Sequence, residues 1–429
     1  MTARSFSSTI FPINVAPARD PNPRNLVSDK IRCRYLGAPS ITASFFAFFD
    51  PNSSKFDREK LVSLLLCTAL SACTSQTTKP PDPAASQRNA ALSRIADATH
   101  QSGFNGIVLV ADAQQVLLER AYGRLSPLSD EPLRVDSVFR LASITKKVTA
   151  ILVMQEVSAG RLKLDERLGA YWPDFPNADA RAATLRQLLM HTSGLPNPDD
   201  VDGFYDVKNA ARDHMRTAAQ SVCAQPLRQK PGEKFEYNNC DYLVLGALLE
   251  KLTGTDYETL VRTRVFDPSG MTNAGVYSRD AGLVARHAQG VVDGKSDGVV
   301  NPAAYGAAGG LFGMVRDVWQ LNRAFAAGRL LDEPAKDAMT QPNQWGAALG
   351  VWSYTLKTPA GRLARIVERQ GWIGGIRVVN LLDLNSHTTV VIMSTQGDYD
   401  LSHSWSGKGI AAELILQAVS GASAGIRSP

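Results

Sequence analysis

The chain has 429 residues, of which 44% are hydrophobic and 20% charged, with a formal net charge of +5 at pH 7. This composition is typical of a globular protein with enough length for a large core and one or two domains. Most of the positive excess lies in residues 1–60, and no stripe of Lys and Arg interleaved with aromatic residues occurs, so we expect no nucleic-acid partner. The five cysteines and six histidines show neither C-x-x-C nor H-E-x-x-H spacing, so we expect no metal and no cofactor.

Residues 55–73 have the organisation of an export signal. A charged stretch at 55–60 precedes an apolar stretch at 61–72, which is too short to span a bilayer because a spanning helix needs about 20 residues. The sequence Leu70-Ser-Ala-Cys73 resembles a bacterial lipobox, in which the cysteine becomes lipidated. We therefore predict a lipoprotein-type signal peptide, lipidation of Cys73, and an exported protein anchored to a bacterial membrane and facing the periplasm. A plain signal peptide and a buried helix are the alternatives.

The segments on either side of this signal have the composition of unstructured chain. Residues 1–54 are rich in Pro, Ser and Arg without periodicity, so they are expected to be disordered or to lie upstream of the true start of translation. Residues 74–87 are predicted to form a flexible, Pro-rich tether. If the signal is not used, the chain would instead be a soluble cytosolic protein that starts at Met1.

Two cysteines lie in the remaining part of the chain, Cys223 and Cys240. Export would place them in an oxidising compartment, where disulfides form and persist. The sequence leaves two possibilities open, a disulfide or two buried thiols.

Residues 88–422 are predicted to form one α+β domain. An amphipathic helix at 88–101 precedes two apolar runs, 104–111 and 116–122, which predict a β-hairpin, and helical spacing extends from 143 to 159. Helical segments separated by Pro and Gly fill the middle of the chain, roughly 160–345. The later elements are expected strands at 353–356, 363–368, 377–382 and 388–393, and a last helix at 410–419. Strands at both ends predict one mainly antiparallel sheet flanked by helices, with an inserted helical region.

Two short motifs carry the chemistry, Ser143-Ile-Thr-Lys146 and Tyr237-Asn-Asn239. A serine hydroxyl is a weak nucleophile until a neighbouring base takes its proton. Lys146 follows Ser143 by three residues and so lies on the same side of the expected helix, where its ammonium can contact the hydroxyl and favour ionisation of a nearby phenol. Each motif alone is compatible with a helix cap, a surface lysine or a turn. Together they predict an activated serine at a helix N-terminus, which favours developing negative charge.

Further stretches in the same order make the chain similar to the serine β-lactamase-related hydrolases of the class C type, which include DD-peptidases, D-aminopeptidases and esterases. The resemblance covers roughly residues 90–420. It rests on the stretches 139–146, 160–165, 185–195, 231–246, 267–271 and 309–312. It implies the β-lactamase/DD-peptidase-like fold.

The resemblance also implies roles for individual residues. Tyr237 is the implied base for acylation and later the acid for the leaving group, and Asn239 is implied to hold Lys146 and a substrate carbonyl or amide. The backbone N–H groups of Ser143 and Trp372 form the implied oxyanion hole. His191 is expected to be a scaffold residue.

The third family motif departs from its usual pattern of Lys or His, any residue, and Gly. The aligned residues here are Arg369-Gln-Gly371, so Gly371 keeps space for close approach while Arg369 keeps positive charge on a longer, forked side chain. We predict that Arg369, Gly371 and Trp372 bind substrate, with Arg369 either gripping a carboxylate or pointing away. The departure weakens the expectation of β-lactam turnover.

The sequence thus predicts a serine hydrolase that forms an acyl-enzyme at Ser143, with Lys146 and Tyr237 as the base system. The expected substrates are small esters, D-amino-acid peptides or β-lactams. A true class C-type β-lactamase or DD-carboxypeptidase is the first alternative. A catalytically silent module that binds cell-wall peptides is the second.

Overall fold

The computed structural model describes residues 82–205, 214–277, 287–296, 301–401 and 403–420. The expected upstream segment, the expected signal with Cys73, and the first part of the expected tether lie outside these residues. Helix α2 (Pro83–Gln101) extends into the expected tether, because Asp82 caps it by accepting the N–H of Ala84 and Pro83 suits the first helical position. Residues 83–87 are therefore helical, and the tether prediction is wrong for them.

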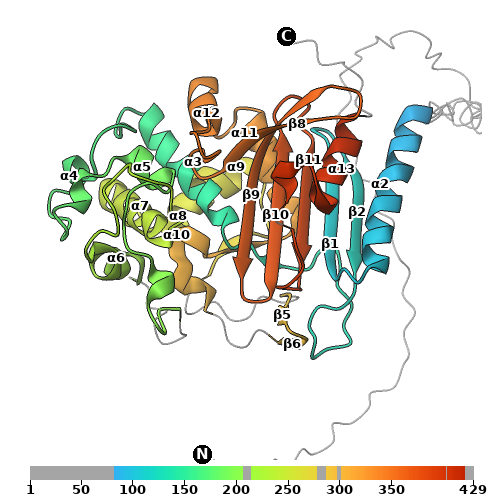
Figure 1. The fold of residues 1–429 in the computed structure, drawn as a ribbon, viewed down its shortest axis with the longest axis horizontal. Helices are drawn as coiled ribbons and strands as arrows, with labels where there is room; N and C mark the ends of the chain where they lie inside the picture. The colour runs from blue at the N-terminus through green and yellow to red at the C-terminus, as the bar shows by residue number, and fades with distance from the viewer. Residues whose placement is uncertain (1–81, 206–213, 278–286, 297–300, 402, 421–429) are drawn as a thin grey trace, which may run out of the picture. The chain divides into compact units, whose positions relative to one another are not determined.

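A six-stranded antiparallel sheet lies at the centre of the domain that begins with α2 (Figure 1). The strands run in the order β2-β1-β11-β10-β9-β8. Their bounds are β1 (Gly106–Ala111), β2 (Val116–Tyr122), β8 (Trp352–Lys357), β9 (Leu363–Ile373), β10 (Ile376–Asp383) and β11 (Thr389–Ser394). Because β1 pairs with β11, with Gly106 opposite Ser394, the N-terminal hairpin and the C-terminal strands share one sheet. The predicted α+β fold is confirmed.

Both faces of the sheet are covered, which explains the continuous apolar runs in its strands. Successive side chains of a strand point to opposite faces: in β1, Leu109 packs into one apolar cluster and Val108 and Val110 pack into another. Helices α2 and α13 (Gly409–Ser420) cover one face, and helices α3 (Ile144–Ser158) and α11 (Val315–Ala326) cover the other.

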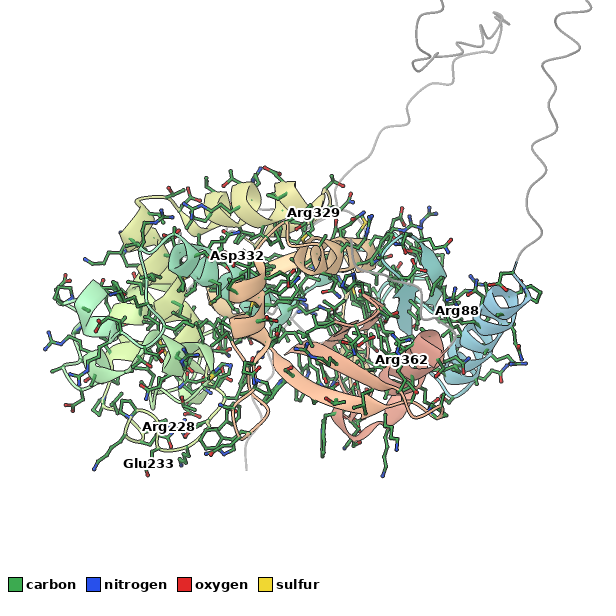
Figure 2. The ribbon with its side chains drawn as sticks, turned by 90° about the horizontal axis from the view of Figure 1, so that it is seen from above. Arg88, Arg228, Glu233, Arg329, Asp332 and Arg362 are labelled. Carbon is green, nitrogen blue, oxygen red and sulfur yellow. A yellow bond between two sulfur atoms is a disulfide. The ribbon has the colours of Figure 1, made fainter. Side chains whose placement is uncertain are left out.

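The inserted helical region follows α3. Its helices are α4 (Leu168–Tyr171), α5 (Leu185–Leu189), α6 (His214–Gln220), α7 (Asn239–Thr253), α8 (Tyr257–Val261), α9 (Asp267–Ser269) and α10 (Gly306–Gly309), with α12 (Glu333–Thr340) after α11. Short strands pair outside the main sheet, β3 (Phe139–Arg140) and β4 (Gly275–Val276) with β7 (Leu311–Gly313), and β5 (Val291–Val292) with β6 (Lys295–Ser296). Figure 2 shows Arg228 and Glu233 at the outer edge, on the segment that leads to α7. Within the described ranges, no helix is long and apolar enough to cross a membrane.

Candidate active site

Ser143 is the N-cap residue of α3. It follows Ala142, whose φ of 46° lies in the left-handed region that residues other than glycine seldom adopt. Strand β9 passes close to this turn, and a Cβ atom at Gly371 would lie 2.8 Å from the backbone nitrogen of Ser143. Position 371 therefore requires glycine, because the strand meets the backbone of the serine itself. Trp372, the next residue on the strand, lines the same pocket as Ser143.

Lys146 is buried one turn further along α3. Its Nζ donates to Asn239 Oδ1 at 2.7 Å, to the carbonyl oxygen of Ala308 at 2.8 Å and to Ser143 Oγ at 3.2 Å. These three acceptors match the three N–H groups of an ammonium ion. Burial lowers the pKa of Lys146 to about 8, although the neighbouring Tyr237 opposes this shift. The expected contact between Asn239 and Lys146 is present.

Tyr237 contacts the serine from the other side. Its hydroxyl oxygen lies 2.6 Å from Ser143 Oγ and accepts a hydrogen bond from Arg369 Nη2 at 2.7 Å. Because Ser143 Oγ accepts from Lys146, its own hydrogen is free to point toward the tyrosine oxygen. Burial would raise the pKa of Tyr237, but the positive charges of Arg369 and then Lys146 outweigh burial and hold the pKa below its usual value. The tyrosine oxygen is thus arranged as a proton acceptor.

Arg369 does not point away from the site, so that sequence expectation is wrong. Its residue is only 2% exposed, and its Nε donates to the carbonyl oxygen of Ser143 at 2.9 Å while Nη2 donates to Tyr237. Binding of a substrate carboxylate by Arg369 stays a prediction. The side chain lines the same pocket as Ser143. It ties the backbone of the serine to the tyrosine oxygen, because the long forked guanidinium can span both acceptors.

Ser143, Tyr237 and Arg369 line one pocket of about 580 Å³, together with Asn239. Trp372 is 59% exposed at its rim, and the guanidinium of Arg377 stacks on the indole ring at 4.0 Å from its centroid. Sequence reasoning missed Arg377. Its position could have been inferred from the Gly374-Gly375 turn, since a tight hairpin places Arg377 directly opposite Trp372.

Among the described residues that line this pocket, Asp199 is the only carboxylate. Its Oδ1 accepts from Asn239 Nδ2 at 2.9 Å and also from the hydroxyl of Tyr205. The ring of Tyr205 stacks on Tyr305 with centroids 3.8 Å apart. Asn239 therefore joins Lys146 to a fixed carboxylate beside an aromatic wall. No sequence pattern marks Asp199, Tyr205 or Tyr305, because short 3₁₀ turns carry Asp199 and Tyr305 and an irregular turn carries Tyr205.

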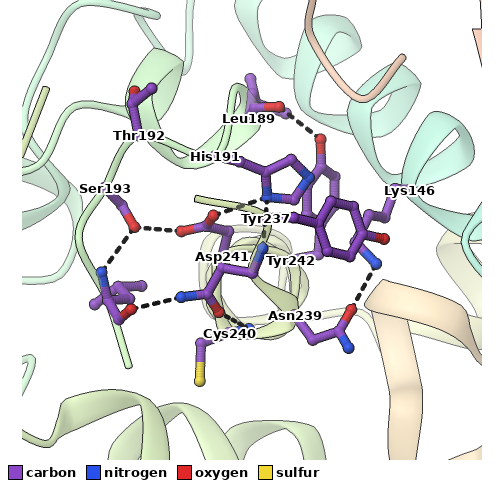
Figure 3. Close-up of polar contacts among 12 residues, drawn as sticks. Lys146, Leu189, His191, Thr192, Ser193, Tyr237, Asn239, Cys240, Asp241 and Tyr242 are labelled. Carbon is purple, nitrogen blue, oxygen red and sulfur yellow. Dashed lines mark hydrogen bonds and ion pairs between the residues drawn. The ribbon is translucent and has the colours of Figure 1, made fainter. Parts of the chain in front are cut away.

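A second polar cluster lies next to Tyr237 (Figure 3). The hydroxyl of Ser193 donates to Asp241, and Asp241 Oδ2 lies 3.0 Å from His191 Nδ1. All three residues are buried. The cluster contains the residue types of a catalytic triad, but its serine bonds to the carboxyl group and not to the imidazole.

Cys223 and Cys240 form a disulfide, which decides between the two possibilities that the sequence left open. Cys240 lies in the first turn of α7, directly after Asn239. The bond therefore fixes the helix N-terminus that carries Asn239 to the segment Val222–Ala224.

Comparisons with known proteins agree with this geometry. A sequence model of the Beta-lactamase family matches residues 92–404. Penicillin-binding protein 4* of Bacillus subtilis (strain 168) is 31% identical over 182 residues, which cover 41% of this chain and 39% of that protein. Penicillin-binding protein 4 of Amycolatopsis lactamdurans is 34% identical over 170 residues, covering 39% of this chain and 43% of that protein. The matched part thus spans about two fifths of each relative.

Solved structures share the fold. D-amino acid amidase from Ochrobactrum anthropi SV3, complexed with L-phenylalanine amide, superposes with a TM-score of 0.66 at 22% identity, covering 78% of this chain and 98% of that chain. A penicillin binding protein from Bacillus halodurans gives a TM-score of 0.61 at 24% identity, and the superposition covers 76% of this chain and 97% of that chain. The family match extends over most of the domain and includes Ser143, Lys146 and Tyr237. The chain belongs to the Beta-lactamase family of serine hydrolases.

Proposed function

We propose that the protein hydrolyses small esters or amides through an acyl-enzyme at Ser143. The observation that carries this proposal is the line of contacts from Lys146 Nζ to Ser143 Oγ at 3.2 Å and on to the Tyr237 oxygen at 2.6 Å. Tyr237 takes the proton of Ser143 as Oγ attacks the carbonyl carbon, and then gives it to the leaving group. The backbone N–H groups of Ser143 and Trp372 stabilise the oxyanion. Water then releases the acyl group by the same route.

The first test compares the full chain with its Ser143→Ala variant on p-nitrophenyl butyrate. We expect hydrolysis by the native chain, loss of hydrolysis in the variant, and an acyl adduct on the peptide that contains Ser143 in mass spectra. Equal activity in the two proteins would exclude Ser143 as the nucleophile. Binding of cell-wall peptides without turnover of any substrate would favour the silent binding module.

Among the candidate substrates, we propose that those with a free ammonium group on the acyl portion are preferred over those with a carboxylate. Two donors of Arg369 are already engaged by Ser143 and Tyr237. Asp199 is exposed in the pocket beside the stacked ring of Tyr205, and a carboxylate next to aromatic faces attracts an ammonium ion. This favours amino-acid esters and D-amino-acid peptides with a free amino end.

Charge-matched substrates test this preference. We expect an amino-acid p-nitrophenyl ester to have a KM about tenfold below that of its N-acetyl derivative, and Asp199→Asn to remove this difference while leaving the N-acetyl substrate unchanged. The alternative β-lactamase or DD-carboxypeptidase activity requires binding of a carboxylate, and Arg377 is one of the two cationic residues among the described residues that line the pocket. Efficient nitrocefin hydrolysis that Arg377→Gln abolishes would favour that alternative.

We also propose that Cys73 is lipidated and that the exported protein faces the periplasm on a membrane anchor. The support is the lipobox-like sequence at the end of a short apolar stretch. Palmitate labelling that disappears in Cys73→Ser is the expected result. Unlabelled protein in the cytosol would favour the soluble hydrolase that starts at Met1.

A further inference from the structure

His191 contacts the backbone on both sides of Tyr237. Its carbonyl oxygen accepts from the N–H of Glu236 at 2.8 Å, and its Nδ1 accepts from the N–H of Asn238 at 3.2 Å. Its ring lies beside that of Tyr237 (Figure 3), and the two ring centroids are 4.5 Å apart. The φ angle of His191 is 58°, in the left-handed region. A buried residue in an uncommon conformation thus holds the segment that carries the proposed base.

The hydrogen bonds around His191 indicate where one proton lies. Nδ1 accepts the N–H of Asn238, so it presents its single lone pair and carries no hydrogen, and the hydrogen of the neutral ring lies on Nε2, which is buried without a hydrogen-bond partner among the described residues. Asp241 Oδ2 lies 3.0 Å from Nδ1, and two acceptors at this distance would repel each other. The hydrogen between them therefore belongs to Asp241. The other oxygen of Asp241 accepts from Ser193, whose Oγ accepts in turn from the N–H of Leu195.

The surroundings favour an uncharged pair. The side chains of His191 and Asp241 are 3% and 0% exposed, and burying two ions is costly unless they are very well compensated. Burial raises the pKa of Asp241 well above its usual value, although Ser193 and Lys146 oppose the shift. Burial also lowers the pKa of His191, and Arg369 and Lys146 lower it further. The titratable and charged groups that face the pair are Lys146 from α3, Arg369 from β9, Glu236 and Tyr237 from the preceding loop, and Tyr242 from α7.

We propose that Asp241 is a neutral carboxylic acid that donates to His191, and that the two form an uncharged clamp which positions Tyr237. They are positioning residues, because they act through the backbone of Glu236 and Asn238. The clamp holds the Tyr237 oxygen 2.6 Å from Ser143 Oγ. The effect of the clamp on kinetics rests on the proposed function. The protonation of Asp241 also affects the stability of the fold, and that effect can be measured whether or not the proposed function is correct.

The variant Asp241→Asn tests whether Asp241 carries a proton in the folded protein. Asparagine can donate from Nδ2 to His191 and accept from Ser193 with Oδ1, so it reproduces the pattern of a protonated acid. A buried acid with a raised pKa makes the folded state lose stability as pH rises above about 4, and asparagine removes this dependence. We therefore expect a folded variant whose melting temperature rises relative to the native chain as pH increases. A variant that is much less stable than the native chain at neutral pH would show an ionised pair and overturn the proposal.

Two substitutions at His191 test the clamp. His191→Asn keeps an acceptor near the position of Nδ1 and tolerates the left-handed backbone, whereas His191→Phe keeps a ring without the acceptor. We expect the asparagine variant to keep the native pH profile of kcat. The phenylalanine variant should lose about 10²-fold in kcat, with KM little changed and the acid limb moved to higher pH, because Tyr237 is misplaced.

The opposite ranking, with phenylalanine as active as the native chain or a shifted acid limb in the asparagine variant, would overturn the clamp. If His191→Phe does not fold, the pH profile of His191→Asn still tests the clamp, since a shifted acid limb in that variant would contradict it. If the native chain hydrolyses nothing, the proposed function has failed, and the pH dependence of the melting temperature of Asp241→Asn remains as the test of the proton.

Discussion

Ser143 and Ser193 both lie in polar clusters with titratable partners, but their hydroxyl hydrogens face different groups. Ser143 Oγ lies between the ammonium of Lys146 and the oxygen of Tyr237, whose pKa is lowered by Arg369 and Lys146 against the effect of burial. Ser193 faces Asp241, whose pKa burial raises. The first arrangement points the serine hydrogen at Tyr237, the proposed base. The second points it at Asp241, which we propose already holds a proton.

The two serines also differ in access. Ser143 lines the pocket, whereas Ser193 is 1% exposed. Residue types alone would favour the cluster of Ser193, since it contains serine, histidine and aspartate. The comparison teaches that the direction of each hydrogen bond and the access of substrate separate a reactive cluster from a structural one.

The largest expected effect comes from removing the base of the first cluster. Tyr237→Phe should lower kcat by about 10²–10⁴-fold with little change in folding, because the proton of Ser143 then has no acceptor. Tyr242→Phe is the matched control, since its hydroxyl donates to the carbonyl oxygen of Leu189 in the same region. Steady-state kinetics of both variants check this. Similar losses in the two would assign the effect to packing.

The next effect concerns the charge that tunes the base. Arg369→Gln should raise the pKa of Tyr237, because the removed guanidinium favours the ionised form. A smaller fraction of the tyrosine is then ionised at pH 7, so activity should fall about tenfold there and recover toward alkaline pH. The acid limb of the kcat/KM profile measures the shift. Arg377→Gln, at the pocket rim, should leave this limb in place, and an equal shift in both variants would contradict the assignment.

In the second cluster, the serine should matter for stability. Ser193→Ala leaves an oxygen of Asp241 and the N–H of Leu195 without their partner, which should lower the free energy of unfolding by about 1–3 kcal/mol. Denaturant titration measures this loss, and kcat should fall far less than in Ser143→Ala. A variant as inactive as Ser143→Ala but fully stable would reverse the roles of the two clusters.

The smallest expected effect concerns Lys147, the buried lysine next to Lys146, and it is an effect on stability. Lys147 is buried, donates to Asn322 Oδ1 at 2.6 Å, and has its pKa lowered to about 7 by burial. The unfolded chain binds this proton up to about pH 10, so between pH 7 and 10 the native chain gains stability as pH rises. Lys147→Met should raise the melting temperature at pH 7, with the gain shrinking toward pH 10. Equal gains at both pH values would show that the lysine is not buried uncharged.

The sequence was most informative where chemistry is local. The spacing of Ser143 and Lys146 along one helix predicts that their side chains meet, and the structure confirms this contact. The contact of Asn239 with Lys146 was implied by family resemblance and is also present. The alternation between the two sheet faces follows from strand geometry in the same way.

Long-range placement was harder to predict. Arg369 bonds to the backbone of Ser143 from 226 residues away, and nothing in the residues near it indicates that a forked side chain would turn toward Tyr237. Asp199 lines the pocket from a short 3₁₀ turn, Pro198–Asp200, and meets Asn239 from 40 residues away in the sequence. The helical start of α2 was missed because the prolines suggested a tether, whereas Pro83 occupies the first turn of the helix, where an N–H group has no partner within the helix.

The shared sheet has a consequence for synthesis. Strand β1 can pair with β11 only after almost the whole chain has left the ribosome, and Arg369 and Gly371 reach Ser143 on a strand of that late part. In a nascent chain, Ser143 is therefore synthesised long before Arg369 and strand β9, which contact it in the folded protein. If the proposed function holds, we expect a chain that ends before β9 to be inactive, because it lacks Arg369 and Gly371. Two separately expressed pieces, divided before β8, would regain activity only by assembling into one sheet.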